Sequence, residues 1–534
     1  MFYSFFGIFV FFLFLSLLVH QQFNTQIQSF SKYLLFVIYA AYLHILKSEN
    51  SLRKINFQQI EKTIMSLSLI EIAICFFKYF YNGNFSGWLL GNPLYSSLLI
   101  SAGICFTLFK KRNTLKDNIL KGLIICFGFF SLYLLHTRTI FIAISLVLIL
   151  YVWKVFNRFR LYLLLPFLFF LFLPQFWFFI FKTNDLNSLS SLELIGRGII
   201  WKTALLSIKD HILLGNGIGL FERAYYFYQQ PTFHLLRYSH ATAFAHNSFL
   251  QLAVEVGIPA LIFLICGMYF LFKYLRIFKK FNAVSTLTFV FGMAATFYFP
   301  YYLPFLGLLF VAVLMSPKLP LTKEIIFPAW TKIVIISFLF LLSSIVFLNG
   351  IGYLFYFLGN GKIALQIAPM NPELRYKIFE DSLLKNEFSN KKEVLTALRE
   401  TIKYDSNNAF YLARIAMFEE SPSEQDKYFL KAIKLAPRHA PFYIKYALLQ
   451  MNRGEDQIAN QLLNEALKLE PNAPITYYAK GILGLRKGNR LVASTFFEQS
   501  LTLHEKYFPE IDSSPYSKFM FGINIDEIRG LLKK

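Results

Sequence analysis

Long apolar runs separated by short basic loops recur from Phe2 to about Phe357, and no other feature constrains the fold as strongly. Each run is close to the ~20 residues that an α-helix needs to cross a bilayer. The chain is 56% hydrophobic with a mean hydropathy of +0.48, a balance that a water-soluble domain could not hide from solvent. The sequence therefore predicts a polytopic membrane domain over residues 1–357, followed by a polar tail that continues to Lys534.

The apolar runs predict an all-α fold of about eleven membrane spans. The first run has no basic segment before it and no small-residue cleavage site, so it is interpreted as a retained span and not as a signal peptide. The short second and tenth runs could be partly re-entrant. The expected spans are residues 2–19, 33–46, 64–80, 89–109, 119–135, 139–155, 161–181, 247–272, 284–299, 303–316 and 333–357.

Clusters of Lys and Arg follow every second run, as the positive-inside rule expects for cytoplasmic loops. This explains the net charge of +22 without nucleic acid as a partner. The N-terminus is then cytoplasmic in a bacterial inner membrane, while the long loop 182–246 and the polar tail are periplasmic. The four cysteines fall in separate spans without nearby histidines, which argues against disulfides and zinc.

The tail repeats itself at an interval of 34 residues, from Lys431–Pro437 to Glu465–Pro471. This is the tetratricopeptide period of two helices per unit, and residues 364–369 and 401–406 look like earlier copies. The pattern predicts a TPR-like α-solenoid over residues 358–505 and a C-terminal extension over 506–534. Stacked repeats expose a concave surface for a protein partner, but they could equally pack on the membrane domain.

Three side chains predicted to lie at the outer membrane interface are candidates for chemistry: Arg138, Arg197 and His246. Arg138 could simply extend its charge to the membrane surface, and His246 could cap a helix. Gln251 and Glu255 continue from His246 at helical spacing, and polar groups there usually face a cavity.

The segment after Arg197 is amphipathic, with its apolar face formed by Trp201, Leu205, Ile208 and Ile212, and should lie along the membrane surface. Gly215–Gly219 resembles a nucleotide-binding loop only superficially, because no strand precedes it and no Lys-Ser/Thr follows. A turn that ends the helix is the better interpretation.

The order of these pieces resembles the bacterial O-antigen ligase and O-antigen polymerase superfamily over roughly residues 87–317. One departure leaves ligase versus polymerase open: the Arg-x-x-x-Leu pattern of the ligases is not met, because Trp201 follows Arg197 and Ile142 follows Arg138. The matching pieces are Gly91-Asn92-Pro93, Thr137-Arg138-Thr139, Gly196-Arg197 with Trp201, Gly215 to Gly219 with Phe221, and His246-Asn247 followed by Gly257.

The resemblance implies a GT-C-like transferase that moves a glycan from a polyprenyl diphosphate lipid to an acceptor hydroxyl. Arg138 and Arg197 would bind the departing diphosphate, since guanidinium groups bind phosphates bidentately. His246 would bind the diphosphate or deprotonate the acceptor. The membrane domain lacks Asp-x-Asp, so neither a metal nor another cofactor is expected. Glu255, Asn247, Tyr225 and Trp201 are second-rank candidates, while Arg223, Arg237 and His240 stay unranked.

The acceptor is left open among lipid A core, which is favoured, another glycan and a protein hydroxyl. A rival hypothesis is a membrane scaffold that works through its repeats, although about eleven spans exceed what anchoring needs. A transporter is a weaker rival, because transporter sites usually lie at the bilayer midplane.

Overall fold

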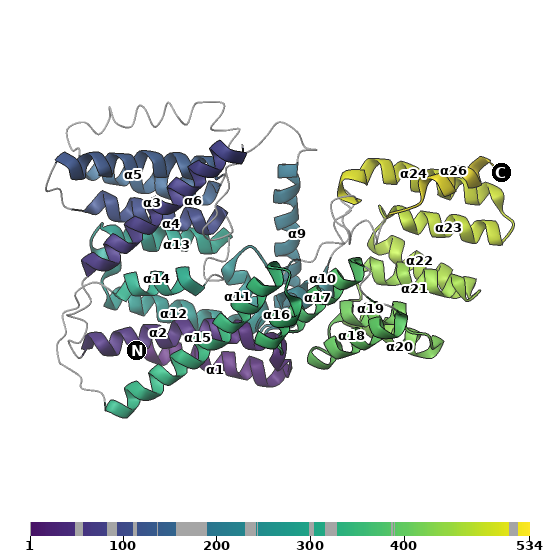
Figure 1. Cartoon of the computed structure of the whole chain (residues 1–534), viewed down its shortest axis with the longest axis horizontal. Coiled ribbons are helices and arrows are strands. Elements are labelled where there is room, and N and C mark those ends of the chain that lie inside the picture. The colour runs from purple at the N-terminus through teal and green to yellow at the C-terminus, as the bar shows by residue number, and fades with distance from the viewer. Residues whose placement is uncertain are drawn as a thin grey trace. The chain divides into compact units, whose positions relative to one another are not determined.

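The structure is a computed structural model, and every element in its described residues is helical (Figure 1). The predicted span over 161–181, together with Arg237 and His240, lies outside the described residues. The described residues are 2–48, 57–82, 93–110, 115–135, 137–155, 189–229, 242, 244–297, 304–315, 328–385, 388, 390–511 and 522–533.

The chain forms two compact units, each built from several stretches of sequence. Unit 1 comprises Met1–Leu15, Gln28–Gly198 and Phe244–Val346. Unit 2 comprises Ser16–Ile27, Ile199–Ala243 and Phe347–Lys534. The second unit thus combines most of the predicted long loop with the polar tail, and the predicted division at Phe357 stays a prediction.

Apolar helices make up the described part of unit 1, and four of them, α1, α2, α9 and α15, also contribute residues to unit 2. The helices that begin before the long loop are Phe2–His20 (α1), Phe23–Ser48 (α2), Phe57–Asn82 (α3), Pro93–Phe109 (α4), Leu115–Leu134 (α5), Arg138–Val155 (α6) and Leu189–Asp210 (α9). Those that follow the loop are Ser248–Val256 (α11), Ile258–Tyr274 (α12), Ala283–Phe297 (α13), Pro304–Met315 (α14) and Ala329–Phe357 (α15), with the 3-10 turn Ile277–Lys279 (η3).

Helix α4 lies at the centre of unit 1 and is buried from Leu94 to Leu108. It packs against α3, α5, α6 and α13, which lie around it in Figure 1. Small residues allow the close approach to α3, since a Cβ on Gly103 would lie 2.4 Å from Ser68 Cβ. The Ser68 hydroxyl also donates to the Leu99 carbonyl at 2.6 Å, so α3 and α4 are joined by both packing and a buried hydrogen bond.

Only α15, among the described helices, is both long and apolar enough to cross a bilayer by itself. The predicted number of spans and their topology therefore remain predictions. Shorter apolar stretches in unit 1 and at its border are Ser4–His20, Pro93–Phe109, Lys121–Leu134, Ile258–Tyr274 and Ala283–Thr296.

The continuous helix predicted over residues 247–272 is wrong. Gly257 separates α11 from α12 with a φ of 92°, a conformation that L side chains rarely adopt. Pro259 then occupies the first turn of α12, where its missing N–H leaves no hydrogen bond unmade. The break makes α11 a separate short helix that begins immediately after His246-Asn247.

The tail in unit 2 consists of consecutive helices, each packed against the next, and the pairs α21–α22 and α23–α24 lie one after the other in Figure 1. The helices of the tail are Gly361–Ile367 (α16), Pro372–Leu384 (α17), Lys391–Tyr404 (α18), Ala409–Phe418 (α19), Pro422–Leu435 (α20), Ala440–Asn452 (α21), Asp456–Leu469 (α22), Pro474–Arg486 (α23), Arg490–Ile511 (α24) and Ile525–Lys533 (α26).

The repeated motif of the sequence recurs as a repeated structure. The Tyr443 hydroxyl donates to the Pro437 carbonyl at 2.8 Å, and 34 residues later Tyr477 donates to Pro471 at 2.9 Å. All four motif copies form the junction between one helix pair and the next. At each junction a residue after the first helix donates its N–H to the last turn: Ala368, Asp405, Ala436 and Glu470. The tail is thus a helical-repeat domain, and its tetratricopeptide assignment stays a prediction.

Candidate active site

His246 has a left-handed backbone, with a φ of 50°, which is uncommon for a residue with a Cβ. The next residue, Asn247, is extended and caps α11: its side-chain oxygen accepts from the N–H groups of Phe249 at 2.9 Å and Leu250 at 3.0 Å. The cap is therefore Asn247, and the half-buried imidazole of His246 is not used for it. Strained backbone of this kind is concentrated at functional sites.

A buried polar chain behind His246 fixes this conformation. The Gln251 side chain accepts from the Ala245 N–H at 2.7 Å and donates to Glu255 Oε1 at 2.7 Å. Gln251 and Glu255 are only 6% and 3% exposed, so both bonds are shielded from water. The two polar residues that the sequence placed on one helix face thus hold the residue before His246.

Arg138 is the first residue of α6 and is half-buried. The residue before it, Thr137, shares a 2.6 Å hydrogen bond with Ser97 of α4, and the Ser97 hydroxyl lies 2.8 Å from the Pro93 carbonyl. The start of α4 and the start of α6 are thereby joined. Two pieces of the sequence pattern, Pro93 and Thr137-Arg138, lie at these two helix starts.

Arg197 lies within α9, which begins at Leu189 and thus extends further toward the N-terminus than the predicted amphipathic segment. Arg197 and Trp201 are both half-buried and one turn apart on the helix. The residues of the predicted apolar face differ in burial: Ile208 is buried, whereas Leu205 is 57% exposed and Ile212 is 50% exposed. Exposed apolar side chains beside Lys202 and Lys209 are what a helix at a membrane surface presents.

The glycines after α9 form a turn that ends one helix and starts the next, as predicted. Gly215, Gly217 and Gly219 have φ values of 65°, 111° and 73°. A side chain at Gly217 would meet Leu220 at 2.6 Å and the His20 ring at 3.0 Å. Asn216 donates to Ser207 at 2.8 Å, and the Ile218 N–H donates to Ser16 at 3.0 Å. The turn leads into Phe221–Tyr228 (α10).

Helix α10 carries Tyr225, a second-rank candidate for the site, and Arg223, an unranked one. Tyr225 is buried and stacks with Phe221 at 6.5 Å between ring centroids, which makes it a packing residue of unit 2. Arg223 forms an ion pair with Asp405 of the repeats at 2.5 Å. The sequence did not single out this pair: Asp405 is acidic where two other copies have Ala368 and Ala436, but the fourth copy has the acid Glu470 at the same position.

The three principal candidates, Arg138, Arg197 and His246, all belong to unit 1, and none of them is an isolated side chain. Two lie at or just before a helix start, and the third lies within a helix. No group of three or more His, Cys, Asp or Glu that could hold a metal occurs in the part of the chain that the structure describes.

The fold defines a class of protein in which a domain of apolar helices is joined to a domain of helical repeats. Within it, residues 122–265 match the family model described as O-antigen ligase, and this match supports the resemblance to the O-antigen ligase superfamily that the sequence indicated. The members of this family are glycosyltransferase-like ligases and polymerases of the inner membrane. The matched segment contains Arg138, Arg197 and His246.

Two solved structures resemble part of the chain, "Crystal structure of MamA" and "Crystal structure of MamA protein". The first is 20% identical, with 29% of this chain and 95% of MamA covered and a TM-score of 0.26. The second is 19% identical, with 30% and 93% covered and the same TM-score of 0.26. None of the curated proteins matches the chain.

Proposed function

We propose that this chain transfers a glycan from a polyprenyl diphosphate carrier to an acceptor hydroxyl at the periplasmic face of the inner membrane. The reaction is metal-independent and inverting, and lipid A core is the favoured acceptor. The observation that carries the proposal is the strained and braced His246 within a segment that matches the O-antigen ligase family.

The arginines supply what the departure of a diphosphate requires. Breaking the bond between sugar and diphosphate releases a polyanion, and fixed cations that meet this charge lower the barrier. Arg138 and Arg197 are assigned this role, because guanidinium forks bind phosphate oxygens bidentately. Trp201 lies one turn from Arg197 and is assigned to line the same region.

His246 is assigned to the acceptor hydroxyl or to the diphosphate. An imidazole titrates near neutral pH, which suits a general base, and as imidazolium it binds phosphate. The Gln251–Glu255 chain acts as its support, since it holds the Ala245 N–H and thereby the backbone of the neighbouring His246. Asn247 fixes the start of α11 on the other side.

The test compares Arg197→Ala with Lys202→Ala, an exposed cation in the same helix. Each variant is produced in a deletion strain, and glycan transfer from the polyprenyl diphosphate donor is measured in membranes, with protein quantity checked by immunoblot. Arg197→Ala, and likewise Arg138→Ala and His246→Ala, should abolish transfer at normal protein levels, whereas Lys202→Ala should transfer normally. Full activity of Arg197→Ala would contradict the assignment of Arg197 to the diphosphate.

The acceptor is identified by the polysaccharides of the deletion strain. Polymer that accumulates on the carrier lipid and is absent from lipid A identifies a ligase. Loss of long chains alone identifies a polymerase, and unglycosylated proteins identify a protein O-oligosaccharyltransferase.

The helical repeats support a second candidate, a non-enzymatic scaffold that recruits an envelope complex. Its test is complementation of the deletion strain by the repeats on one unrelated membrane span. Rescue would favour the scaffold, while failure of this chimera beside rescue by the full chain favours the transferase.

A further inference from the structure

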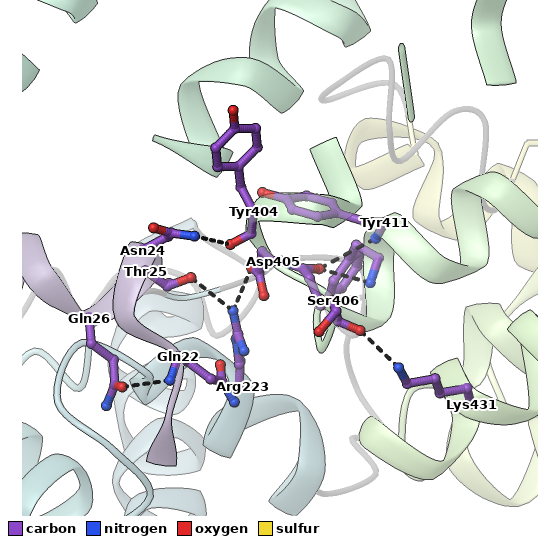
Figure 2. Close-up of polar contacts among 12 residues, drawn as sticks. Gln22, Asn24, Thr25, Gln26, Arg223, Tyr404, Asp405, Ser406, Tyr411 and Lys431 are labelled. Atoms are coloured by element: carbon purple, nitrogen blue, oxygen red, sulfur yellow. Dashed lines mark hydrogen bonds and ion pairs between the residues drawn. The ribbon is translucent and has the colours of Figure 1, made fainter. Parts of the chain in front are cut away.

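Two segments far apart in the sequence meet in unit 2: helix α10 of the long loop and the junction between α18 and α19 of the repeats. Figure 2 shows Arg223 of α10 pointing toward Asp405, to which it donates at 2.5 Å, and toward Thr25 of α2, at 3.3 Å. The Asp405 side chain is only 2% exposed, and that of Arg223 is 21% exposed. Asn24 beside Thr25 donates to the Tyr404 carbonyl at 3.1 Å, so the same junction is held from α2 as well.

Asp405 is an unfavourable residue for its position. It follows the last turn of α18, where the helix dipole disfavours negative charge, and its carboxylate is buried. The corresponding junction residues Ala368 and Ala436 show that the repeat itself does not require an acid there. Asn408 Nδ2 donates to the Asp405 carboxylate at 3.4 Å within the junction, and Arg223 supplies the compensating charge from α10 at the shorter distance of 2.5 Å.

An aromatic contact adds to the ion pair and spans two successive repeats. The Tyr226 ring lies 4.4 Å from that of Phe410 in α19 and 5.1 Å from that of His439, the residue before α21. Phe442 completes the cluster, 4.5 Å from His439. Helix α10 also packs against α20, so it contacts helices of consecutive units rather than a single repeat.

A short hydrogen-bonded connection leads from this contact to the helix of Arg197. Helix α10 follows the Gly215–Gly219 turn, which is tied back to α9 by the hydrogen bond from Asn216 to Ser207. The Leu220 N–H donates to the Gly217 carbonyl at 3.0 Å, which closes the turn immediately before α10. Helices α9 and α10 are therefore joined by a short hydrogen-bonded turn and not by a long linker.

We propose that the docking of α10 on the repeats, through Arg223–Asp405 and the Tyr226 cluster, positions the C-terminal part of α9, the helix that carries Arg197. This rests on the proposed transferase function. Arg223 and Asp405 are then positioning residues of the reaction. A ligand that changes the angle between the α18–α19 and α20–α21 junctions changes the transfer rate, because Tyr226 and Arg223 bridge these two junctions.

The experiment uses the full chain in detergent with the polyprenyl diphosphate donor and compares Asp405→Ala with Glu470→Ala. Glu470 is the acid at the equivalent junction of a later repeat, where its side chain accepts locally from the Asn472 N–H. Two quantities are measured for each variant: amide hydrogen exchange of α10 and of α17–α24, and kcat and KM for the donor.

For Asp405→Ala we expect α10 to exchange at least tenfold faster while α21–α24 keep their protection, and kcat to fall at least tenfold with little change in KM. The Glu470→Ala variant should keep both the α10 protection and kcat. The charge-exchanged double variant Arg223→Asp/Asp405→Arg should recover a substantial part of kcat, which a general loss of repeat stability would not permit.

Three results would overturn the inference: unchanged α10 exchange in Asp405→Ala, faster α10 exchange with normal kcat, or equal losses of kcat in Asp405→Ala and Glu470→Ala. Failure of the proposed function looks different. In that case the unmodified chain transfers nothing from the donor, or Arg197→Ala transfers at the normal rate, whatever the exchange of α10.

Discussion

Replacing Gln251 by Leu tests whether the buried chain behind His246 is needed for the reaction. The substitution keeps the approximate volume of a residue that is 6% exposed, but it removes two 2.7 Å hydrogen bonds. The Ala245 N–H loses its bond to Gln251, and the Glu255 carboxyl loses a donor.

The size of the effect follows from the burial of both partners. A buried polar group that loses its partner costs about 1–3 kcal/mol, and a charged one more, so the chain contributes roughly 2–6 kcal/mol. The left-handed backbone of His246 costs on the order of 1–3 kcal/mol. Because the bracing is at least comparable in size to the strain, its removal should let His246 relax to an ordinary conformation. A displacement of about 1 Å of a reacting group lowers rates by roughly 100-fold.

The assay measures kcat for glycan transfer with purified Gln251→Leu and, as control, Thr288→Val. Thr288 is a buried polar residue in α13 whose hydroxyl donates to the Val284 carbonyl of the same helix at 2.7 Å. We expect about a 100-fold loss in kcat for Gln251→Leu and less than a threefold loss for Thr288→Val. Normal turnover of a folded Gln251→Leu protein would refute the argument that the chain positions His246.

Three further substitutions probe the turn, the repeats and the start of α6. Gly217→Ala should destabilise the turn by more than about 1 kcal/mol, because the side chain would meet Leu220 and His20 at a φ of 111°; in Gly198→Ala, which has open space, melting temperature should not fall. Burial lowers the pKa of His439 from 6.5 to about 3, so the folded repeats bind fewer protons than the unfolded chain. Their stability is complete above about pH 6.5 and falls by about 1.4 kcal/mol per pH unit as the pH drops toward 3. His439→Phe should remove this slope in chemical denaturation at pH 4–7, and an unchanged slope would contradict the cause given. Ser97→Ala, which deletes the bond to Thr137 before Arg138, should lower transfer several-fold, whereas its neighbour Ser96→Ala, whose hydroxyl has no partner in the described residues, should not.

Helix positions and repeat junctions could be predicted from the sequence because both follow from short-range patterns. Apolar runs of helical length predicted α4, α6 and α13 to within a few residues of their bounds. The 34-residue interval placed the helix junctions at Ala436 and Glu470, since each motif copy folds locally in the same way.

The interruption at Gly257 was missed, although its signals were present. The residues on both sides of Gly257 are apolar, so the hydrophobic pattern alone predicts one continuous span. A glycine followed two residues later by proline is a helix-breaking combination, and it decides the local backbone even in an apolar run.

The pairing of Arg223 with Asp405 could not be predicted, because the two residues are 182 positions apart and nothing local links them. From the sequence alone, Arg223 is an unranked cation of the long loop. In the structure, the Arg223 guanidinium is paired with Asp405 of the repeats. Arg223 is therefore not grouped with Arg138 and Arg197, the candidate ligands of the diphosphate.

The most direct test of the central proposal is an experimental structure of the full chain with a bound polyprenyl diphosphate. The account predicts guanidinium nitrogens of Arg138 and Arg197 at about 2.7–3.2 Å from diphosphate oxygens, with the imidazole of His246 facing the same group. A diphosphate bound elsewhere, with all three side chains beyond hydrogen-bonding reach, would contradict it.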